Sequence, residues 1–137
     1  EHGNPNNTGT AGGGHVVRAL VIDNSRLVRS FLRRALARLG FDIDEAEDGM
    51  HGWLSLHTAG PFSLVVAEAE LPRLGGEQLL QRMRADLTYR QTRFLMLADA
   101  GSTQLSALLA GADACLAKPF GFDHLATTLR SFGWSVG

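Results

Sequence analysis

A short apolar run, followed by an acidic residue and a turn rich in proline and glycine, limits what this chain can fold into. The run spans residues 64–67, and no polar residue interrupts it. A half-buried strand alternates apolar and polar residues, whereas a continuous run is typical of a strand buried on both faces of a parallel sheet. Glu68 follows directly, and Pro72 and Gly75–Gly76 delay the next helix. Because ligands of open parallel sheets bind beyond the carboxyl ends of the strands, Glu68 lies where functional side chains are expected.

Short apolar runs alternate with segments of helical periodicity along the rest of the chain. We predict strands at residues 18–22, 41–46, 64–67, 93–98 and 114–117. Apolar residues recur every three or four positions between them, which predicts helices at residues 26–39, 49–58, 77–85, 102–109 and 123–132. Strands that alternate with helices at this spacing predict an α/β fold with a doubly wound parallel sheet.

Composition narrows the class of protein. The 137 residues suffice for one domain with a full core, which we place at residues 15–137. Residues 1–14 are mostly Gly, Asn and Thr and are expected to form a flexible tail or linker, as in a piece of a longer protein. The net charge of −1 argues against DNA binding, and the single Cys115 excludes an internal disulfide and multi-cysteine zinc patterns. Without a membrane-span or signal-peptide pattern, we expect no membrane insertion and a cytoplasmic location.

Polar side chains gather where the predicted strands end. Asp23 and Asn24 follow the first strand, Glu68 follows the third, and Lys118 follows the fifth. Parallel strands end at the same edge of a sheet, so these side chains are expected to meet. Carboxylates that face an amine could hold Mg²⁺ or could pair with the amine.

Four segments resemble the receiver domain of two-component response regulators. They are residues 20–26, 45–49, 71–76 and 111–120. The resemblance covers about residues 18–132 and implies five parallel strands in the order 2-1-3-4-5, helices on both faces and a cis peptide before Pro119. It also implies that an Asp at the end of the third strand accepts a phosphoryl group. An acidic pair after the first strand would hold Mg²⁺, and a Ser or Thr and a Lys would contact the phosphate.

The chain departs from that pattern at the positions that carry the chemistry. The acceptor position is Glu68, and the acidic pair is reduced to Asp23 and the amide Asn24. Ala98 replaces the hydroxyl, and Cys115 replaces the aromatic side chain of the last strand. A misplacement of about 1 Å can cost about a hundredfold in rate, and Glu68 is one methylene longer than Asp.

These departures predict a phosphoacceptor site that no longer works. We expect no catalytic residue and no required cofactor, with a weak Mg²⁺ site at most on Asp23 and Glu68. Lys118 is expected to pair with Glu68 or Asp23 directly. The function that follows is a non-phosphorylatable pseudo-receiver, not an enzyme, that regulates by protein interaction within a hybrid kinase or multidomain regulator.

The sequence leaves alternative functions and the identity of the partners open. A working phosphoacceptor would use Glu68, or the neighbouring Glu70. A receptor for an anionic ligand such as a cyclic dinucleotide, or a docking face, would use the stripe of Arg26, Arg29 and Arg33. Expected partners are a histidine kinase, a phosphotransfer protein or an adjoining kinase or output domain. A homodimer could form through the fourth helix, fifth strand and fifth helix, whose apolar residues include Leu105, Leu108, Leu109 and Leu116.

Overall fold

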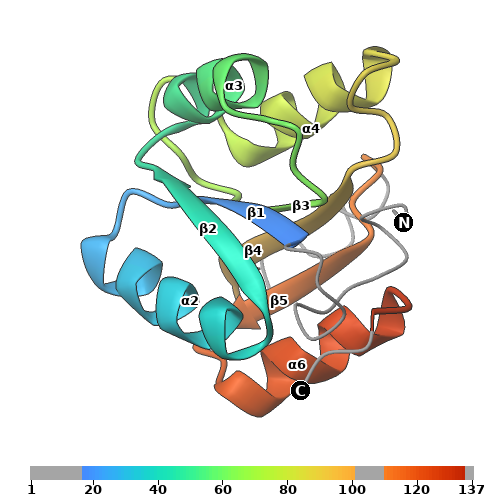
Figure 1. Cartoon of the computed structure of the whole chain (residues 1–137). Helices are drawn as coiled ribbons and strands as arrows, with labels where there is room; N and C mark the ends of the chain where they lie inside the picture. Colours follow the sequence, from blue (N-terminus) through green and yellow to red (C-terminus); the bar gives the residue numbers. More distant parts are fainter. Residues whose placement is uncertain (1–16, 101–109, 135–137) are drawn as a thin grey trace.

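The five predicted strands form one parallel sheet in the computed structural model, which describes residues 17–100 and 110–134 (Figure 1). The strands are β1 (Val17–Ile22), β2 (Phe41–Ala46), β3 (Leu64–Glu68), β4 (Arg93–Asp99) and β5 (Ala114–Lys118). They pair in the order β2-β1-β3-β4-β5, and every pair is parallel. The predicted fold class and strand order are therefore confirmed.

Helices cover both faces of the sheet. They are α2 (Arg26–Arg38), α3 (Gly49–Thr58), α4 (Gly76–Ala85) and α6 (Phe122–Ser131). Helices α2 and α6 lie on one face, and α3 and α4 lie on the other (Figure 1). The helix predicted at 102–109 and the tail predicted at 1–14 lie outside the described residues. Within the described ranges, no helix has the length and apolar character needed to cross a membrane.

The core consists of two apolar layers separated by the sheet. Every residue of β3 is buried, as the continuous apolar run predicted. Successive side chains of a strand point to opposite faces. Leu64 and Val66 therefore pack in the layer that contains α2 and α6, whereas Val65 and Ala67 pack in the layer beneath α3 and α4. Strand β3 thus holds Glu68 at the centre of the sheet.

The helices and strands begin and end close to the predicted positions, because local residues such as helix caps determine where they stop. Ser25 Oγ accepts a hydrogen bond from Val28 N at 3.3 Å, and Asp48 Oδ1 accepts one from His51 N at 2.8 Å, so both residues cap helices. Gly40 has φ +98° and ends the α2 segment. Strands β4 and β5 each extend one residue beyond the prediction, because Asp99 and Lys118 still pair in the sheet.

Arg84 at the end of α4 joins the loop that follows to the start of β5. Its side chain is largely buried and donates hydrogen bonds to the carbonyl oxygens of Tyr89, Arg90 and Thr92 and of Gly111. It also pairs with Asp113 at 3.1 Å. The Arg84 guanidinium thereby donates hydrogen bonds to backbone carbonyl oxygens that lie outside the helices and strands.

We predict that Gly49→Ala will destabilise the fold. A Cβ atom at Gly49 would lie 1.8 Å from the carbonyl oxygen of Leu74, so the loop after β3 and α3 could not keep their close approach. Overpacking of this kind costs about 1–3 kcal/mol in free energy of unfolding, which urea denaturation measures. Gly121→Ala is the matched control, because no atom lies within 4 Å of the added Cβ. Equal losses in the two variants would contradict the steric explanation.

Candidate functional site

The carboxyl ends of three strands bring Asp23, Glu68 and Lys118 together. Asp23 follows β1, Glu68 ends β3 and Lys118 ends β5. In the sheet, β4 separates β3 from β5, so two inter-strand spacings of about 4.8 Å lie between Glu68 and Lys118. The long lysine side chain crosses that gap. The meeting of these side chains at one edge of the sheet, predicted from the strand order, is confirmed.

The three side chains form an ion triad, defined as Asp23, Glu68 and Lys118. Lys118 Nζ lies 3.0 Å from Asp23 Oδ2 and also contacts Glu68 Oε1. The second oxygen of each carboxylate accepts a backbone N–H: Asp23 Oδ1 from Ser25 at 2.8 Å, and Glu68 Oε2 from Glu70 at 3.1 Å. All four carboxylate oxygens therefore have a donor. Lys118 pairs with both acids, where the sequence predicted one or the other.

Because Asp23 and Glu68 are buried, their negative charges are balanced by Lys118 and not by solvent. The side chains of Asp23 and Glu68 are 1% and 7% exposed, and that of Lys118 is 23% exposed. Burial lowers the pKa of Lys118, but hydrogen bonds to Glu68 and Asp23 and the charges of both acids outweigh it, so the pKa of Lys118 is raised above 10.5. Lys118 is therefore charged at neutral pH and compensates buried negative charge.

The donor set at this site does not fit Mg²⁺ well. Mg²⁺ requires near-octahedral oxygen coordination, usually with one or two carboxylates available to it. Here the oxygens of Asp23 and Glu68 accept hydrogen bonds from the chain, and Lys118 places a positive charge between them. In residues 17–100 and 110–134, no group of three His, Cys, Asp or Glu side chains could hold a metal ion. Asn24, at the other position of the former acidic pair, is exposed.

The two remaining departures from the receiver pattern lie in β4 and β5. Ala98 is buried at the end of β4 and offers no hydroxyl. Cys115 is partly buried in β5, where burial and then the charge of Glu68 raise the pKa of its thiol. A raised pKa keeps the thiol protonated at neutral pH, so Cys115 is a poor nucleophile.

The arginine stripe of α2 is largely committed to contacts within the chain. Arg29 donates to Glu45 Oε1 at 3.1 Å and to the carbonyl oxygen of Asp23 at 2.6 Å. Arg33 pairs with Glu45 Oε2 at 2.5 Å, and this hydrogen bond, opposed by burial, holds the pKa of Glu45 below its usual range. Only Arg26, which is exposed, lies away from Glu45. The sequence showed the acids of β2 but not that they pair with α2.

The sequence pointed to Arg29 only as a docking or ligand-binding residue and gave no sign that it supports the end of β1. Its hydrogen bond to the Asp23 carbonyl joins α2 to the end of β1, directly behind the triad. Every residue has a backbone carbonyl, so the sequence cannot show which carbonyl accepts a hydrogen bond from Arg29. A hollow of about 500 Å³ adjoins the triad at Lys118. It is lined by Lys118, Asp99 and the apolar residues Leu27, Val28, Phe31, Pro119 and Phe120.

Comparison with known proteins identifies the family in which this arrangement of strands and side chains occurs. The family model described as the response regulator receiver domain matches residues 19–130. The chain belongs to the receiver-domain family. Receiver domains are signalling modules of two-component systems, and they interact with histidine kinases and other proteins.

The relatives of this receiver domain are response regulators and chemotaxis proteins. It is 34% identical to response regulator MprA of Mycobacterium sp. over 115 residues, 84% of this chain and 50% of that protein. It is 31% identical to transcriptional regulatory protein TrcR of Mycobacterium tuberculosis over 85% of this chain and 45% of that protein. It is 29% identical to chemotaxis protein CheY1 of Helicobacter pylori, over 76% of this chain and 86% of that protein. The chain thus spans about half the length of MprA and TrcR.

Solved structures confirm the fold of the receiver domain. Chemotaxis response regulator CheY4 of Vibrio cholerae superposes with a TM-score of 0.78 at 24% identity, covering 86% of this chain and 99% of that one. The receiver domain of sensor histidine kinase PA1611 of Pseudomonas aeruginosa gives 0.78 at 21% identity, covering 86% and 98%. That structure has a magnesium ion coordinated in its active-site cleft. At these identities the similarity shows the fold alone.

We predict that Lys118→Met will destabilise the receiver domain strongly. The substitution keeps most of the apolar stem but leaves the buried carboxylates of Asp23 and Glu68 without their cation. Breaking a buried pair from one side costs about 3–5 kcal/mol in free energy of unfolding, measured by urea denaturation. Arg73→Met is the control, because the Arg73 side chain is 64% exposed in its 3.0 Å pair with Asp48 and surface pairs contribute about 1 kcal/mol or less. Similar losses in both variants would contradict a buried triad.

The stabilisation by Lys118 should also depend on pH in the alkaline range. Because folding raises the pKa of Lys118 above 10.5, its contribution is complete below that value and is lost as the pH rises through the folded-state pKa. We expect the difference in free energy of unfolding between wild type and Lys118→Met to stay constant from neutral pH to about pH 10 and then to narrow. Urea denaturation of both proteins at a series of pH values measures this difference. If the difference begins to narrow well below about pH 10, burial lowers the pKa of Lys118 and the prediction is wrong.

Proposed function

We propose that this receiver domain is a pseudo-receiver that regulates by protein interaction without accepting a phosphoryl group. The observation that carries the proposal is the state of Glu68, the residue at the acceptor position. One of its oxygens contacts Lys118 Nζ, and the other accepts the backbone N–H of Glu70. Both oxygens of this carboxylate are hydrogen-bonded within the chain, and the charge of Lys118 lowers their reactivity towards a phosphorus atom.

The chemistry of phosphoryl transfer supports the same proposal. Transfer requires an in-line nucleophile and positive groups that stabilise charge on the equatorial oxygens. In this chain Lys118 is already neutralised by Asp23 and Glu68, and Ala98 has no hydroxyl to contact a phosphoryl oxygen. The residues that would position and stabilise the transferred group are thus either absent or engaged.

The partner in this proposal is another signalling protein or domain. A histidine kinase, a phosphotransfer protein or an adjoining kinase or output domain fits a chain that spans half the length of MprA. The apolar hollow of Leu27, Phe31 and Phe120 beside Lys118 offers a surface for such a partner. Homodimerisation through Leu116 and the predicted helix at 102–109, and a cytoplasmic location, belong to the same proposal; Leu116 itself is buried.

We predict that the wild-type chain will not be phosphorylated by a small phosphodonor. The chain is incubated with acetyl phosphate and Mg²⁺, and its intact mass is then measured. We expect no added phosphoryl group, because Glu68 and Lys118 are occupied with each other. A Mg²⁺-dependent mass increase that is lost in Glu68→Gln would contradict the proposal and support a working acceptor.

A variant with the receiver residues restored provides the positive control. Asn24→Asp, Glu68→Asp and Ala98→Thr together supply the second carboxylate, the shorter acceptor and the hydroxyl. The variant should gain one phosphoryl group under the same conditions, and circular dichroism checks that it remains folded. Labelling of the variant alone would attribute the lost activity to these three positions.

A further inference from the structure

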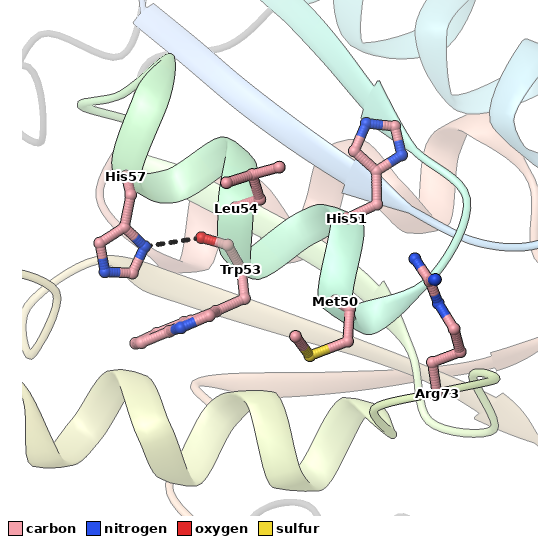
Figure 2. A pocket seen from close by; sticks show the side chains of 6 residues that line it. All are labelled: Met50, His51, Trp53, Leu54, His57 and Arg73. Atoms are coloured by element: carbon pink, nitrogen blue, oxygen red, sulfur yellow. Dashed lines mark hydrogen bonds between the residues drawn. The ribbon is translucent and has the colours of Figure 1, made fainter.

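A second surface, on the side of the sheet away from α2 and α6, groups exposed apolar side chains around two hollows. We call it the α3–α4 face and define it by six residues: Met50, Trp53, Leu54, Arg82, Asp86 and Leu87. One hollow of about 570 Å³ lies along α3 and another of about 520 Å³ lies at the end of α4, and Trp53 lines both. In Figure 2, Met50 and Trp53 extend from α3 toward α4, and Arg73 reaches up from the loop beyond β3.

Exposed apolar side chains concentrate on this face. In the part of the chain that the structure describes, the exposed large apolar residues are Leu27, Met50, Leu54 and Leu87, with exposures of 83%, 40%, 59% and 79%. The last three belong to the α3–α4 face. Single exposed apolar residues need no explanation, whereas a group around a hollow is typical of a protein-binding surface.

The face carries both a projecting apolar side chain and a hollow that such a side chain fits. Leu87 follows the end of α4, is mostly exposed, and borders the hollow whose other lining residues include Trp53 and Ala85. The Trp53 ring is held edge-on by His57, with centroids 4.5 Å apart, and by Tyr89 at 5.7 Å. A surface with both features can be complementary to a copy of itself.

The arginines and aspartates around the two hollows balance each other in charge. Arg73 lines the hollow along α3 and pairs with Asp48 at 3.0 Å. Arg82 and Asp86 both line the hollow at the end of α4, and within residues 17–100 and 110–134 neither belongs to an ion pair. The guanidinium carbon of Arg82 lies 5.7 Å from the centroid of the Trp53 ring. The face therefore presents one positive and one negative group, about one helical turn apart, that no other charge of the described chain pairs with.

We propose that the α3–α4 face binds a second copy of this chain, across a two-fold axis that is perpendicular to α4 and crosses it between Arg82 and Asp86. Such an axis places the two copies of α4 antiparallel, so that each contact between two different residues occurs twice. Arg82 and Asp86 lie about 6 Å apart along the helix direction. Arg82 of each copy then faces Asp86 of its partner, and two equivalent ion pairs form.

Apolar contacts accompany the ion pairs in this arrangement. Ala85 precedes Asp86 and is exposed, and its small side chain lets the two copies of α4 approach closely. Leu87 of each copy lies at the hollow of its partner, beside Trp53. Tryptophan is among the residues most often found as binding hot spots, and a ring already fixed by its neighbours loses little entropy on binding.

Other occupants fit this face less well. A partner of one charge sign would pair with either Arg82 or Asp86 and leave the other without an ionic partner. Residues 1–16 and 135–137 contain Val16 and Val136 as their only large apolar residues. Residues 101–109 contain no charged residue and so cannot pair with Arg82 or Asp86. A second copy satisfies both charges with the same set of residues.

This inference goes beyond the proposed function and does not depend on it. A chain that accepted a phosphoryl group on Glu68 would still carry the α3–α4 face, because none of the residues that define the face belongs to the ion triad. The inference also differs from homodimerisation through Leu116 and the predicted helix at 102–109, since the face contains none of those residues. Failure of the pseudo-receiver proposal appears as a covalent phosphoryl group, whereas failure of this inference appears in the mass of the assembly.

Sedimentation velocity of the whole chain at a series of concentrations tests the dimer. We expect the weight-average mass to rise from that of one chain towards twice that value between about 10 µM and about 1 mM. Leu87→Gln should weaken the association by about tenfold or more, because each copy loses one buried leucine. Ala37→Gln is the control, because it adds the same polar side chain at an exposed position of α2, on the other side of the sheet, and should leave the association unchanged (Figure 1).

Mixing of two charge-reversed variants tests the two-fold pairing itself. Arg82→Glu alone sets negative against negative at both ion pairs, and Asp86→Lys alone sets positive against positive. Each variant should therefore associate about tenfold or more weakly than the wild type. A one-to-one mixture of the two variants restores opposite charges at both pairs and should form a mixed dimer. Thermal unfolding verifies that each variant is folded.

Three results would overturn the proposal. The first is a chain that stays monomeric up to about 1 mM. The second is a mixture of Arg82→Glu and Asp86→Lys that associates no better than either variant alone, or single variants that associate as the wild type does. The third is self-association that Leu108→Glu abolishes and Leu87→Gln leaves intact, because that result assigns the dimer to the predicted helix at 102–109.

Discussion

The contact of one lysine with two buried carboxylates is the interaction on which the rest of this receiver domain depends. Asp23 and Glu68 lie at the ends of β1 and β3, almost without solvent, and Lys118 reaches both from β5. Two buried negative charges without a cation would be costly, so the triad joins the three strand ends as well as balancing charge. Arg29 strengthens the same edge by holding the carbonyl of Asp23 from α2.

The same contact determines what the site can do. A phosphoacceptor site must keep a nucleophile and a cation available for a ligand that arrives later. In this chain the longer side chain of Glu68 reaches Lys118 directly, and the remaining oxygens are held by backbone N–H groups. The edge of the sheet is thereby kept in one arrangement by groups of the chain itself. Under the proposed function, signalling through this domain depends on which partner binds, and where.

The two sides of the sheet therefore carry separate properties. The side of α2 and α6 holds the salt bridges of Arg29 and Arg33 and borders the triad, whereas α3 and α4 present apolar side chains around Trp53. On the α3–α4 side, the close approach of Gly49 to Leu74 fixes the loop that leaves Glu68 against the start of α3.

The sequence by itself determined the fold class, the strand order through the receiver resemblance, and the positions of Asp23, Glu68 and Lys118 at the strand ends. Periodicity and caps such as Asp48 are local properties, and a sequence records them directly. Only the tertiary structure decided that Lys118 contacts both acids, that Arg29 and Arg33 are engaged by Glu45, and that Trp53, Leu54 and Leu87 share one face. These contacts join residues far apart in the chain, and their existence depends on strand register and helix packing, which no local pattern specifies.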